Sequence, residues 1–384
     1  MAPAESSLRP VLLVTNDLGP RAGGIETFIL GLLEQLNGHE IVIYTSSQLG
    51  SQKFDQELNE RLGVVVIRDK SRVLLPTPRV ISNIKRVMRA NGTSIVWFGA
   101  AAPLGWMAPN LRSAGAQRIV ALTHGHEVWW SRLVPFKFAM HRIGNHSDVI
   151  TYLGEFTRRA IAPAVGARTG LAHIAPGINT EHFIPSAKPR DLLNKFAIEN
   201  RPIIISVGRL VHRKGQDRLI QALPQIKKAI PDVVLIIVGE GPRGDYLRRL
   251  VKKLDLEPNV IFVGRIHYDE LPRYLNMADI FVMPSRSRFF GLEVEGLGIV
   301  YLEASACGLP VIAGDSGGAP DAVLVGETGY VVGGNNLDAI AKSVIEVLCD
   351  RALMDRLGKR GREWAVSDWN WNSWGARFAL LLKG

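Results

Sequence analysis

Short apolar segments alternate with amphipathic helical segments along almost the whole chain. The run Val11–Thr15 comes first, and after a Gly-containing loop the apolar residues from Ile25 to Leu36 recur three and four positions apart. Such alternation predicts βα repetition around a parallel sheet, which is an α/β fold. The further strand candidates are Ile41–Thr45, Val64–Ile67, Ser94–Phe98, Arg118–Thr123, Val149–Leu153, Leu171–Ile174, Ile203–Val207, Val233–Val238, Val260–Val263, Ile280–Met283 and Val311–Ala313.

The alternation pauses once, in a polar, proline-containing stretch between Pro176 and Pro202. Single cores rarely grow beyond about 250 to 300 residues, so a chain of 384 residues is expected to form two domains. The pause predicts a hinge between two doubly wound units. We expect one domain at residues 1–176, a linker at 177–201, a second domain at 202–365, and a helix at 366–384 that packs back across the junction.

Two glutamates and two glycines follow a strand candidate of the second half. Glu295 precedes the segment Gly296–Gly298, and Glu303 lies further along the helix expected to start there. Glycines admit close backbone approach, and the free N–H groups of a helix start favour negative charge. A helix from Gly296 to Glu303 would span about 11 Å, whereas glycosidase carboxylates lie about 5 to 9.5 Å apart. The pattern therefore favours the grip of a long, phosphorylated and hydroxyl-rich ligand over a hydrolytic pair.

Fixed positive charge follows the strand that ends at Val207. Arg209 and Lys214 flank a loop with glycines at both ends. The arginine guanidinium can donate two parallel hydrogen bonds to phosphate oxygens, and the lysine ammonium is a mobile positive charge. The pair therefore suits a diphosphate, and it could stabilise the negative charge that grows on a departing nucleoside diphosphate. The neighbouring Arg213 is expected to belong to a solvated basic loop.

A second glycine pattern, Gly239-x-Gly241-x-x-Gly244, matches the fingerprint of dinucleotide-binding folds. The next strand ends without an acidic residue for a ribose diol, and Pro242 occupies the expected helix start. We therefore interpret these glycines as tight-turn residues of a loop that can border a ligand.

Strand ends in the first half carry further polar residues. Asp17, Gly23–Gly24 and Glu26 follow the first strand and could admit a second phosphate or sugar. His124 and His126 follow the strand that ends near Thr123. Two histidines alone make a weak metal site, and because no third ligand is apparent we expect no bound metal.

The composition narrows the class of protein. A net charge of +10 and a pI near 9.7 imply attraction to polyanions. Cys307 and Cys349 form neither a metal spacing nor a disulfide framework, which fits a reducing cytoplasm. We find no signal-peptide pattern and no apolar run of transmembrane length, so we expect a cytoplasmic protein.

Two basic segments of the first half raise the hypothesis of peripheral contact with an anionic membrane. Val80–Met88 has helical apolar spacing amid several cations, and Trp129–Arg142 mixes tryptophan, phenylalanine and cations. For the first segment taken alone, an ordinary surface helix with its apolar face on the core is the favoured explanation. Nucleic-acid binding would require a basic stripe with stacking aromatic residues, and these cations are distributed otherwise.

Four of these elements together resemble the two-domain glycosyltransferases of family 4. They are the Gly23-Gly24 loop, Thr123-His-Gly-His-Glu, Gly208-Arg-Leu with Lys214-Gly215, and the segment from Glu295 through Glu303. The resemblance extends over nearly the whole chain. Within that family, Leu292-Glu-Val-Glu-Gly-Leu-Gly and His124-Gly-His-Glu-Val-Trp-Trp are similar to the actinobacterial phosphatidylinositol mannosyltransferases, particularly those that add the second, α-1,6-linked mannose.

The resemblance implies a GT-B fold, in which two Rossmann-like domains face a central cleft, and a retaining reaction without a metal or other cofactor. It further implies GDP-mannose as the donor, held by the second domain, and a phosphatidylinositol mannoside as the acceptor, held by the first. Domain closure would exclude water from the reaction. The expected location is cytoplasmic, peripheral on the inner face of the plasma membrane, with no nucleic-acid partner.

The resemblance also implies roles for individual residues. The reaction would depend on His124, Arg209, Lys214 and Glu295, with His126 as the less favoured active-site histidine. Within the donor site, the diphosphate would contact Arg209 and Lys214, the ribose Glu303, the sugar Glu295 with Gly296, Leu297 and Gly298, and the base Gly264, Arg265 and Ile266, while Gly24 lies toward the phosphates. The acceptor would contact Asp17, Gly23, Glu26 and His126.

Alternatives remain at this stage. A family 4 enzyme with another nucleotide sugar or a soluble acceptor is the nearest one, and a nucleotide-sugar epimerase of similar architecture is another. No residue stands out as a general base, so the departing diphosphate oxygen itself could take the acceptor proton.

Overall fold

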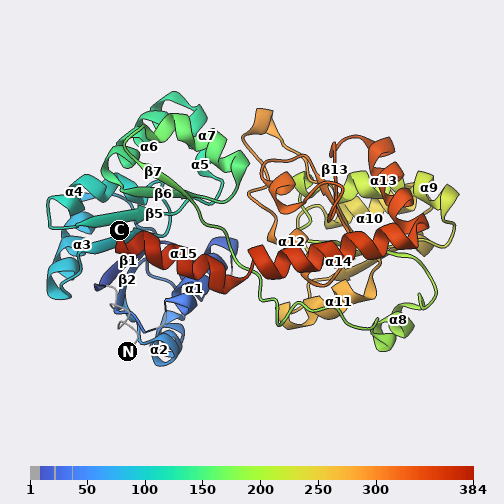
Figure 1. Cartoon of the computed structure of the whole chain (residues 1–384), viewed down its shortest axis with the longest axis horizontal. Helices are drawn as coiled ribbons and strands as arrows, with labels where there is room; N and C mark the ends of the chain where they lie inside the picture. Colours follow the sequence, from blue (N-terminus) through green and yellow to red (C-terminus); the bar gives the residue numbers. More distant parts are fainter. Residues whose placement is uncertain (1–8, 21–22, 37) are drawn as a thin grey trace. The chain divides into compact units, whose positions relative to one another are not determined.

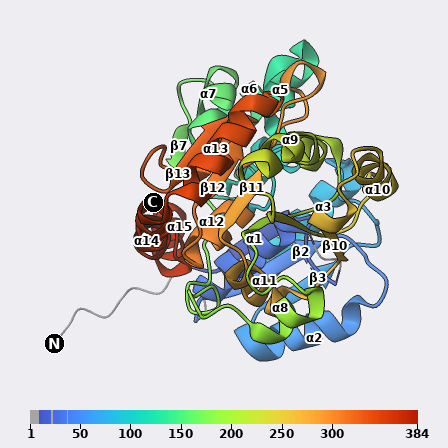
Figure 2. The ribbon, with the colours of Figure 1, turned by 90° about the vertical axis from the view of Figure 1, so that its right-hand side faces the viewer.

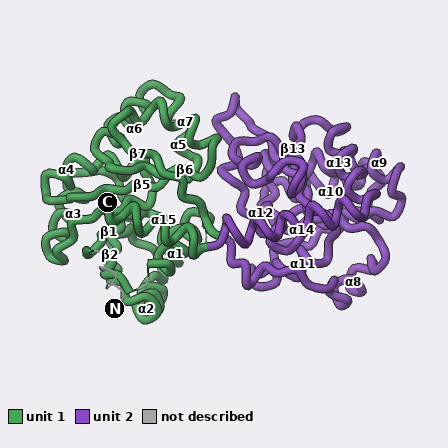
Figure 3. The backbone as a smooth tube through the Cα atoms, viewed as in Figure 1, with its two compact units in different colours: residues 1–177, 371–384 green, residues 178–370 purple. Residues whose placement is uncertain are grey.

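Each half of the chain folds around its own parallel sheet (Figure 1). The computed structural model describes residues 9–384 except positions 21, 22 and 37. One unit comprises residues 1–177 and 371–384, and the other residues 178–370 (Figure 3). The chain therefore passes between the units twice, after Gly177 and after Asn370, and α15 at its end belongs to the first unit.

In the described part of the first unit, the sheet has seven strands in the order β3-β2-β1-β4-β5-β6-β7, and all neighbouring strands are parallel. The central strands are buried on both faces, as expected for parallel strands covered by helices. The strands are β1 (Val11–Thr15), β2 (Ile41–Thr45), β3 (Val65–Arg68), β4 (Ile95–Phe98), β5 (Arg118–Ala121), β6 (Val149–Tyr152) and β7 (Gly170–His173).

Helices cover both faces of this sheet. Helices α3, α4, α6 and α7 pack with Val96 and Phe98 of β4 on one face. On the other face, α15 packs against α1 and β5, and Phe378 of α15 contacts Trp97 of β4. The helices are α1 (Gly24–Gln35), α2 (Ser51–Leu62), α3 (Pro78–Ala90), η1 (Leu104–Met107), α4 (Ala108–Arg112), α5 (Glu127–Arg132), α6 (Val134–His146), α7 (Glu155–Val165) and α15 (Trp371–Lys383).

The second unit repeats this plan with six parallel strands in the order β10-β9-β8-β11-β12-β13. The last of them, at one edge of the sheet, was not predicted from the sequence. The strands are β8 (Ile203–Val207), β9 (Val234–Val238), β10 (Val260–Gly264), β11 (Ile280–Met283), β12 (Val311–Gly314) and β13 (Gly329–Val332).

Two helical layers again enclose the sheet. Figure 2 shows α9 and α13 on one side of strands β11 and β12, with α11 on the other. Helix α14 packs on α12 (Figure 1). The helices are α8 (Arg190–Phe196), α9 (Gln216–Ala229), η2 (His212–Lys214), α10 (Gly244–Lys253), η3 (Glu257–Asn259), η4 (Tyr268–Glu270), α11 (Leu271–Met277), η5 (Phe289–Gly291), α12 (Ile299–Ala306), η6 (Ala319–Ala322), α13 (Leu337–Cys349) and α14 (Arg351–Asp368).

Both sheets reverse their strand order at one point. In the second unit the reversal lies between β8 and β11, and in the first between β1 and β4. Ligands of doubly wound sheets bind beyond the carboxyl ends of the strands at such a reversal. In the second unit, the loops after β8 and β11 meet at this point.

The predicted α/β architecture with two doubly wound units is confirmed. A linker was expected at residues 177–201. Residues 178–201, which include helix α8, belong to the second unit. The apolar face of α3, with Val80, Ile84 and Met88, is buried in the core of the first unit, as an ordinary surface helix would be. Among the described residues, no helix has both the length and the apolar character to cross a membrane.

Candidate functional site

Lys214 and Glu295 come into direct contact where the loops after β8 and β11 meet. The Lys214 Nζ atom lies 3.0 Å from Glu295 Oε2, and both side chains are largely buried. The Glu295 backbone N–H donates to Ser316 Oγ at 3.1 Å, which fixes the residue from a third loop, after β12. Two of the predicted site residues, 81 positions apart in the sequence, are thereby brought together.

The sequence permits this contact because of glycine at position 215. Gly215 has a φ of +76°, and a Cβ atom there would lie 1.9 Å from the carbonyl oxygen of Pro284. Only glycine allows both the backbone conformation and the close approach of the two loops. The loop that carries Lys214 is therefore pressed against the loop that leads to Glu295.

Glu295 is ionised in this setting. Burial would raise the pKa of its carboxyl group, but the positive charges of Lys214 and Arg213 outweigh burial and lower it. Arg213 Nη1 donates to Glu295 Oε2 at 2.7 Å. A buried carboxylate with two cationic partners is a fixed negative charge with hydrogen-bond acceptor capacity.

Glu303 has the opposite electrostatic setting. It lies on α12 and is 7% exposed, and burial raises the pKa of its carboxyl group to about 7, although Lys214 acts to lower it. No hydrogen bond or ion pair joins this side chain to another described residue. A ligand with hydroxyl donors would supply the missing partners.

The helix expected to begin at Gly296 begins later. Gly298 has a φ of +80° and precedes the first helical residue, Ile299. Residues 296–298 therefore form a loop, and the helical distance expected between Gly296 and Glu303 does not apply. The left-handed conformation at Gly298 ends this loop and starts α12.

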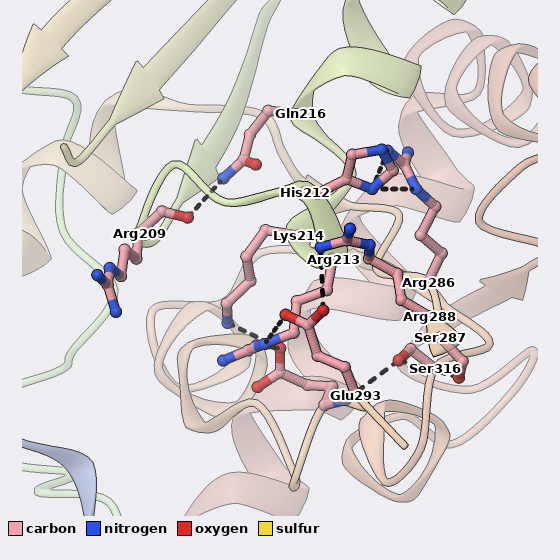
Figure 4. A network of polar contacts seen from close by, with 11 residues as sticks. Arg209, His212, Arg213, Lys214, Gln216, Arg286, Ser287, Arg288, Glu293 and Ser316 are labelled. Atoms are coloured by element: carbon pink, nitrogen blue, oxygen red, sulfur yellow. Dashed lines mark hydrogen bonds and ion pairs between the residues drawn. The ribbon is translucent and has the colours of Figure 1, made fainter. Parts of the chain in front are cut away.

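Arg209 does not join the Lys214–Glu295 contact. Its side chain is exposed and lies apart from Lys214 (Figure 4), with no hydrogen bond or ion pair to the described part of the chain. Its carbonyl accepts a hydrogen bond from Gln216 Nε2 at 3.5 Å. Gly264 is the last residue of β10, Arg265 and Ile266 follow it, and Arg265 is exposed.

In the first unit, the structure fixes the orientation of His124. Its Nε2 atom lies 2.5 Å from the carbonyl oxygen of Gly99, so Nε2 carries the proton and donates it. Its backbone N–H donates to Glu127 Oε2 at 2.9 Å. Burial lowers the pKa of the ring, although Glu127 acts to raise it, and the imidazole is neutral at pH 7 with Nδ1 as an acceptor.

His126 lies beside His124, with ring centroids 6.3 Å apart. Its Nε2 atom is 3.2 Å from Glu127 Oε1 and 3.3 Å from the carbonyl oxygen of Ala102. Glu26 is buried in the first turn of α1, and Gly23 and Gly24 are exposed at its start. In the described ranges, no three histidine, cysteine, aspartate or glutamate residues cluster as metal ligands.

The loop after β1 is tied to its neighbours through its backbone. The Asp17 N–H donates to Thr15 Oγ1 at 2.9 Å. Gln48 Nε2 donates to the carbonyl of Leu18 at 2.7 Å. These two bonds fix the path of the loop from the end of β1 to Leu18.

Sequence reasoning missed the role of Arg213, which was expected to be a solvated residue. The structure instead pairs Arg213 with Glu295. Nearby, Arg286 donates two hydrogen bonds to Asp217, of 3.0 and 2.8 Å. The position of Arg213 directly before Lys214 was the only local signal, since its partner lies 82 residues away.

Both halves of the chain match known protein families. Residues 22–182 match the family Glycosyltransferase Family 4, and residues 190–364 match Glycosyl transferases group 1. The first match covers most of the first unit and ends just beyond Gly177, and the second match lies wholly within the second unit.

Similar proteins extend over nearly the full length. The chain is 45% identical over 97% of its length to the GDP-mannose-dependent alpha-(1-6)-phosphatidylinositol monomannoside mannosyltransferase of Mycolicibacterium smegmatis, of which 98% is covered. It is 41% identical over 98% of its length to the GDP-mannose-dependent monoacylated alpha-(1-6)-phosphatidylinositol monomannoside mannosyltransferase of Corynebacterium glutamicum, of which 99% is covered.

The fold has solved counterparts as well. The sucrose-phosphate synthase of Thermosynechococcus elongatus is similar with a TM-score of 0.79 and 24% identity, over 97% of this chain and 98% of that one. Together with the two parallel Rossmann-like sheets, this likeness confirms the predicted GT-B fold. The chain belongs to glycosyltransferase family 4.

Proposed function

We propose that this protein transfers mannose from GDP-mannose to a phosphatidylinositol monomannoside and forms an α-1,6 linkage. The observation that carries the proposal is the 45% identity, over nearly the full length of both chains, to the enzyme of that name in Mycolicibacterium smegmatis. A relative from another genus, at 41% identity, bears a closely similar name. The proposed acceptor is thus a mannosylated inositol lipid.

In the proposed reaction, the bond between the anomeric carbon of mannose and the diphosphate oxygen breaks, and a bond from that carbon to the acceptor oxygen forms. The acceptor proton passes to the departing diphosphate. An α-linked product from an α-linked donor means retention of configuration. Lys214 and Arg209 would stabilise the negative charge that develops on the departing GDP.

The second unit offers suitable groups for the rest of the donor. Glu303 is buried and has no hydrogen-bond partner among the residues that the structure describes, and it would accept hydrogen bonds from the ribose hydroxyls. The backbone of residues 264–266, at the carboxyl end of β10, would border the guanine. Glu295 with the backbone of residues 296–298 would hold the mannose hydroxyls.

The first unit would hold the acceptor. His124 offers a neutral imidazole with its Nδ1 lone pair available, near His126. Asp17, Gly23, Gly24 and Glu26 lie in the loop after β1 or in the first turn of α1. We assign these groups to the sugar and phosphate of the acceptor and to the reacting end of the donor.

A lipid acceptor requires contact with a membrane surface, and α6 supplies a suitable face. Val134 and Phe138 lie one helical turn apart and are 83% and 65% exposed. Lys137 is exposed between them. Apolar side chains interleaved with cations are typical of surfaces that dock peripherally on anionic lipid, and we propose such docking on a cytoplasmic membrane face.

The test follows radioactivity from GDP-[14C]mannose into the organic phase, with and without vesicles that contain phosphatidylinositol monomannoside. We expect lipid-soluble label only when protein and acceptor are both present. Lys214→Ala and Glu295→Ala should each reduce transfer about a hundredfold or more, the effect of removing one preorganised charged group. Donor recovered intact with unlabelled lipid would contradict the proposal, and a merely modest loss in both variants would contradict the site.

A further inference from the structure

Arg213 is held in place between the loops after β8 and β11, and the proposed reaction gives it no role. The backbone N–H of Arg286 donates to the Arg213 carbonyl at 2.8 Å. Arg286 is itself 3% exposed and donates to both carboxylate oxygens of Asp217. It also contacts His212 Nδ1 at 2.8 Å (Figure 4). The backbone of Arg213 is therefore anchored to the loop after β11 and, through Arg286, to the first turn of α9.

The Arg213 guanidinium and the Lys214 ammonium share one oxygen of Glu295. Arg213 Nη1 is 2.7 Å and Lys214 Nζ 3.0 Å from Oε2. The second oxygen, Oε1, accepts no hydrogen bond from any residue that the structure describes, and the Glu295 side chain is 9% exposed. Oε1 is not among the fully buried polar atoms that lack a partner, so it is the oxygen of this largely buried carboxylate that a donor from a ligand can reach.

Arg213 also connects Glu295 to a second carboxylate. Its Nε atom is 3.8 Å from Glu293 Oε1, and Arg288 Nη1 donates to Glu293 Oε2 at 3.0 Å. Charges of alternating sign therefore run from Lys214 through Glu295, Arg213 and Glu293 to Arg288. If Lys214 turned toward a diphosphate, Arg213 would be the remaining cation on Glu295.

We propose that Arg213 is a positioning residue for the sugar of the donor. It holds Glu295 through Oε2, so that the carboxylate stays ionised and in place when Lys214 engages the diphosphate, and Oε1 accepts a hydrogen bond from a hydroxyl of the transferred sugar. This inference rests on the proposed function, because it takes the ligand to be a sugar nucleotide.

Calorimetric titration of the full chain with GDP and with GDP-mannose separates the two ligand parts. In Arg213→Gln, the ratio of the Kd for GDP-mannose to the Kd for GDP should rise about tenfold or more, as expected for a lost charged hydrogen bond, while GDP affinity changes little. Arg213→Lys should restore most of the ratio. Arg360→Gln is the matched control, since Arg360 pairs with Glu327 at 3.1 Å on the surface of the same unit.

The pH profile of kcat/KM gives a second readout that a structural role would not move. Glu295 must be ionised, and it faces Lys214 and Arg213 from the η2 segment and Tyr301 from α12, with Glu293 and Arg288 beyond Arg213. Without Arg213 its pKa rises, so the acid limb of the profile should move to higher pH in Arg213→Gln and return in Arg213→Lys.

The outcomes are distinct. An unchanged affinity ratio with an unchanged acid limb would overturn the inference, and so would equal losses for GDP and GDP-mannose, which would make Arg213 a phosphate ligand. Failure of the wild-type protein to bind either ligand would overturn the proposed function instead. If Arg213→Gln does not fold, Arg213→Lys is measured alone. The proposal requires that a lysine at this position keep the acid limb and the affinity ratio close to those of the wild type. Values far from the wild type would therefore contradict it.

Discussion

At the scale of single residues, Glu295 in the loop after β11 and Glu303 in α12 differ in charge although both are buried. Burial raises the pKa of Glu303 to about 7. The same burial acts on Glu295, but Lys214 and Arg213 outweigh it and lower the pKa. Without ligand at neutral pH, Glu295 is therefore a full carboxylate and Glu303 is only partly ionised.

Glu303 predicts a pH dependence of stability. Between the ordinary pKa near 4.5 and about 7, the unfolded chain has released this proton while the folded protein still holds it. Stability should therefore fall as the pH rises through this window, by up to about 3 kcal/mol. Glu303→Gln should flatten that part of the profile, measured by chemical denaturation at pH 5 and pH 8. The exposed Glu327→Gln serves as control, and equal slopes in wild type and Glu303→Gln would refute the assignment.

Sequence reasoning found part of the site at this scale. Lys214 and Glu295 follow strands β8 and β11, and because parallel strands end at one edge, their proximity could be expected. The pairing of Arg213 with Glu295 could not, because it depends on the rotamer of a long side chain across 82 positions. The roles of His124 and of residues 264–266 stay predictions.

At the scale of elements, the contact between the loops after β8 and β11 depends on Gly215. Gly215→Ala would place a methyl group 1.9 Å from the Pro284 carbonyl and force the loops apart. We expect a loss of about 1 to 3 kcal/mol in stability and a larger loss in GDP affinity, measured by denaturation and calorimetry. Gly326→Ala is the control, because Gly326 has a φ of +80° with open space around it. Similar effects of both substitutions would speak against the steric argument.

Helix α6 carries the membrane prediction. Val134→Asp combined with Phe138→Asp should weaken association with anionic vesicles about tenfold or more, because two exposed apolar side chains are replaced by acidic ones. Vesicle co-sedimentation measures the effect. Leu380→Asp, at a residue 65% exposed on α15, should bind as the wild type does. Unchanged binding of the α6 variant would exclude this face as the docking surface.

Element boundaries show what local pattern can and cannot predict. Strands such as β8 and β11 were predicted to the residue, because fully buried parallel strands give nearly continuous apolar runs, interrupted in β8 only by Ser206. Strand β13 was missed, since Gly329–Val332 is short, lies at the sheet edge and is only partly buried. The start of α12 was placed too early, because the left-handed Gly298 holds residues 296–298 in a loop.

At the scale of the whole molecule, the end of the chain completes the first unit. Helix α15 contacts α1 and β5, its Phe378 is fully buried, and the Phe378 and Trp97 rings are 4.8 Å apart. Phe378→Ala should destabilise the protein by about 3 to 5 kcal/mol through loss of core packing. Leu380→Ala, on the exposed side of α15, should change stability by less than about 0.5 kcal/mol. Denaturation curves measure both, and equal effects would show that α15 does not secure this unit.

The central claim is mannose transfer from GDP-mannose to an inositol lipid that already carries one mannose. The most direct test is to incubate the purified protein with GDP-[13C]mannose and phosphatidylinositol monomannoside in vesicles, and to determine the linkage in the lipid product by NMR spectroscopy. The account predicts one added mannose, α-linked to the 6-hydroxyl of the first, with UDP-sugars inactive as donors. A different linkage, a preference for another nucleotide sugar, or unlabelled lipid with intact donor would contradict it.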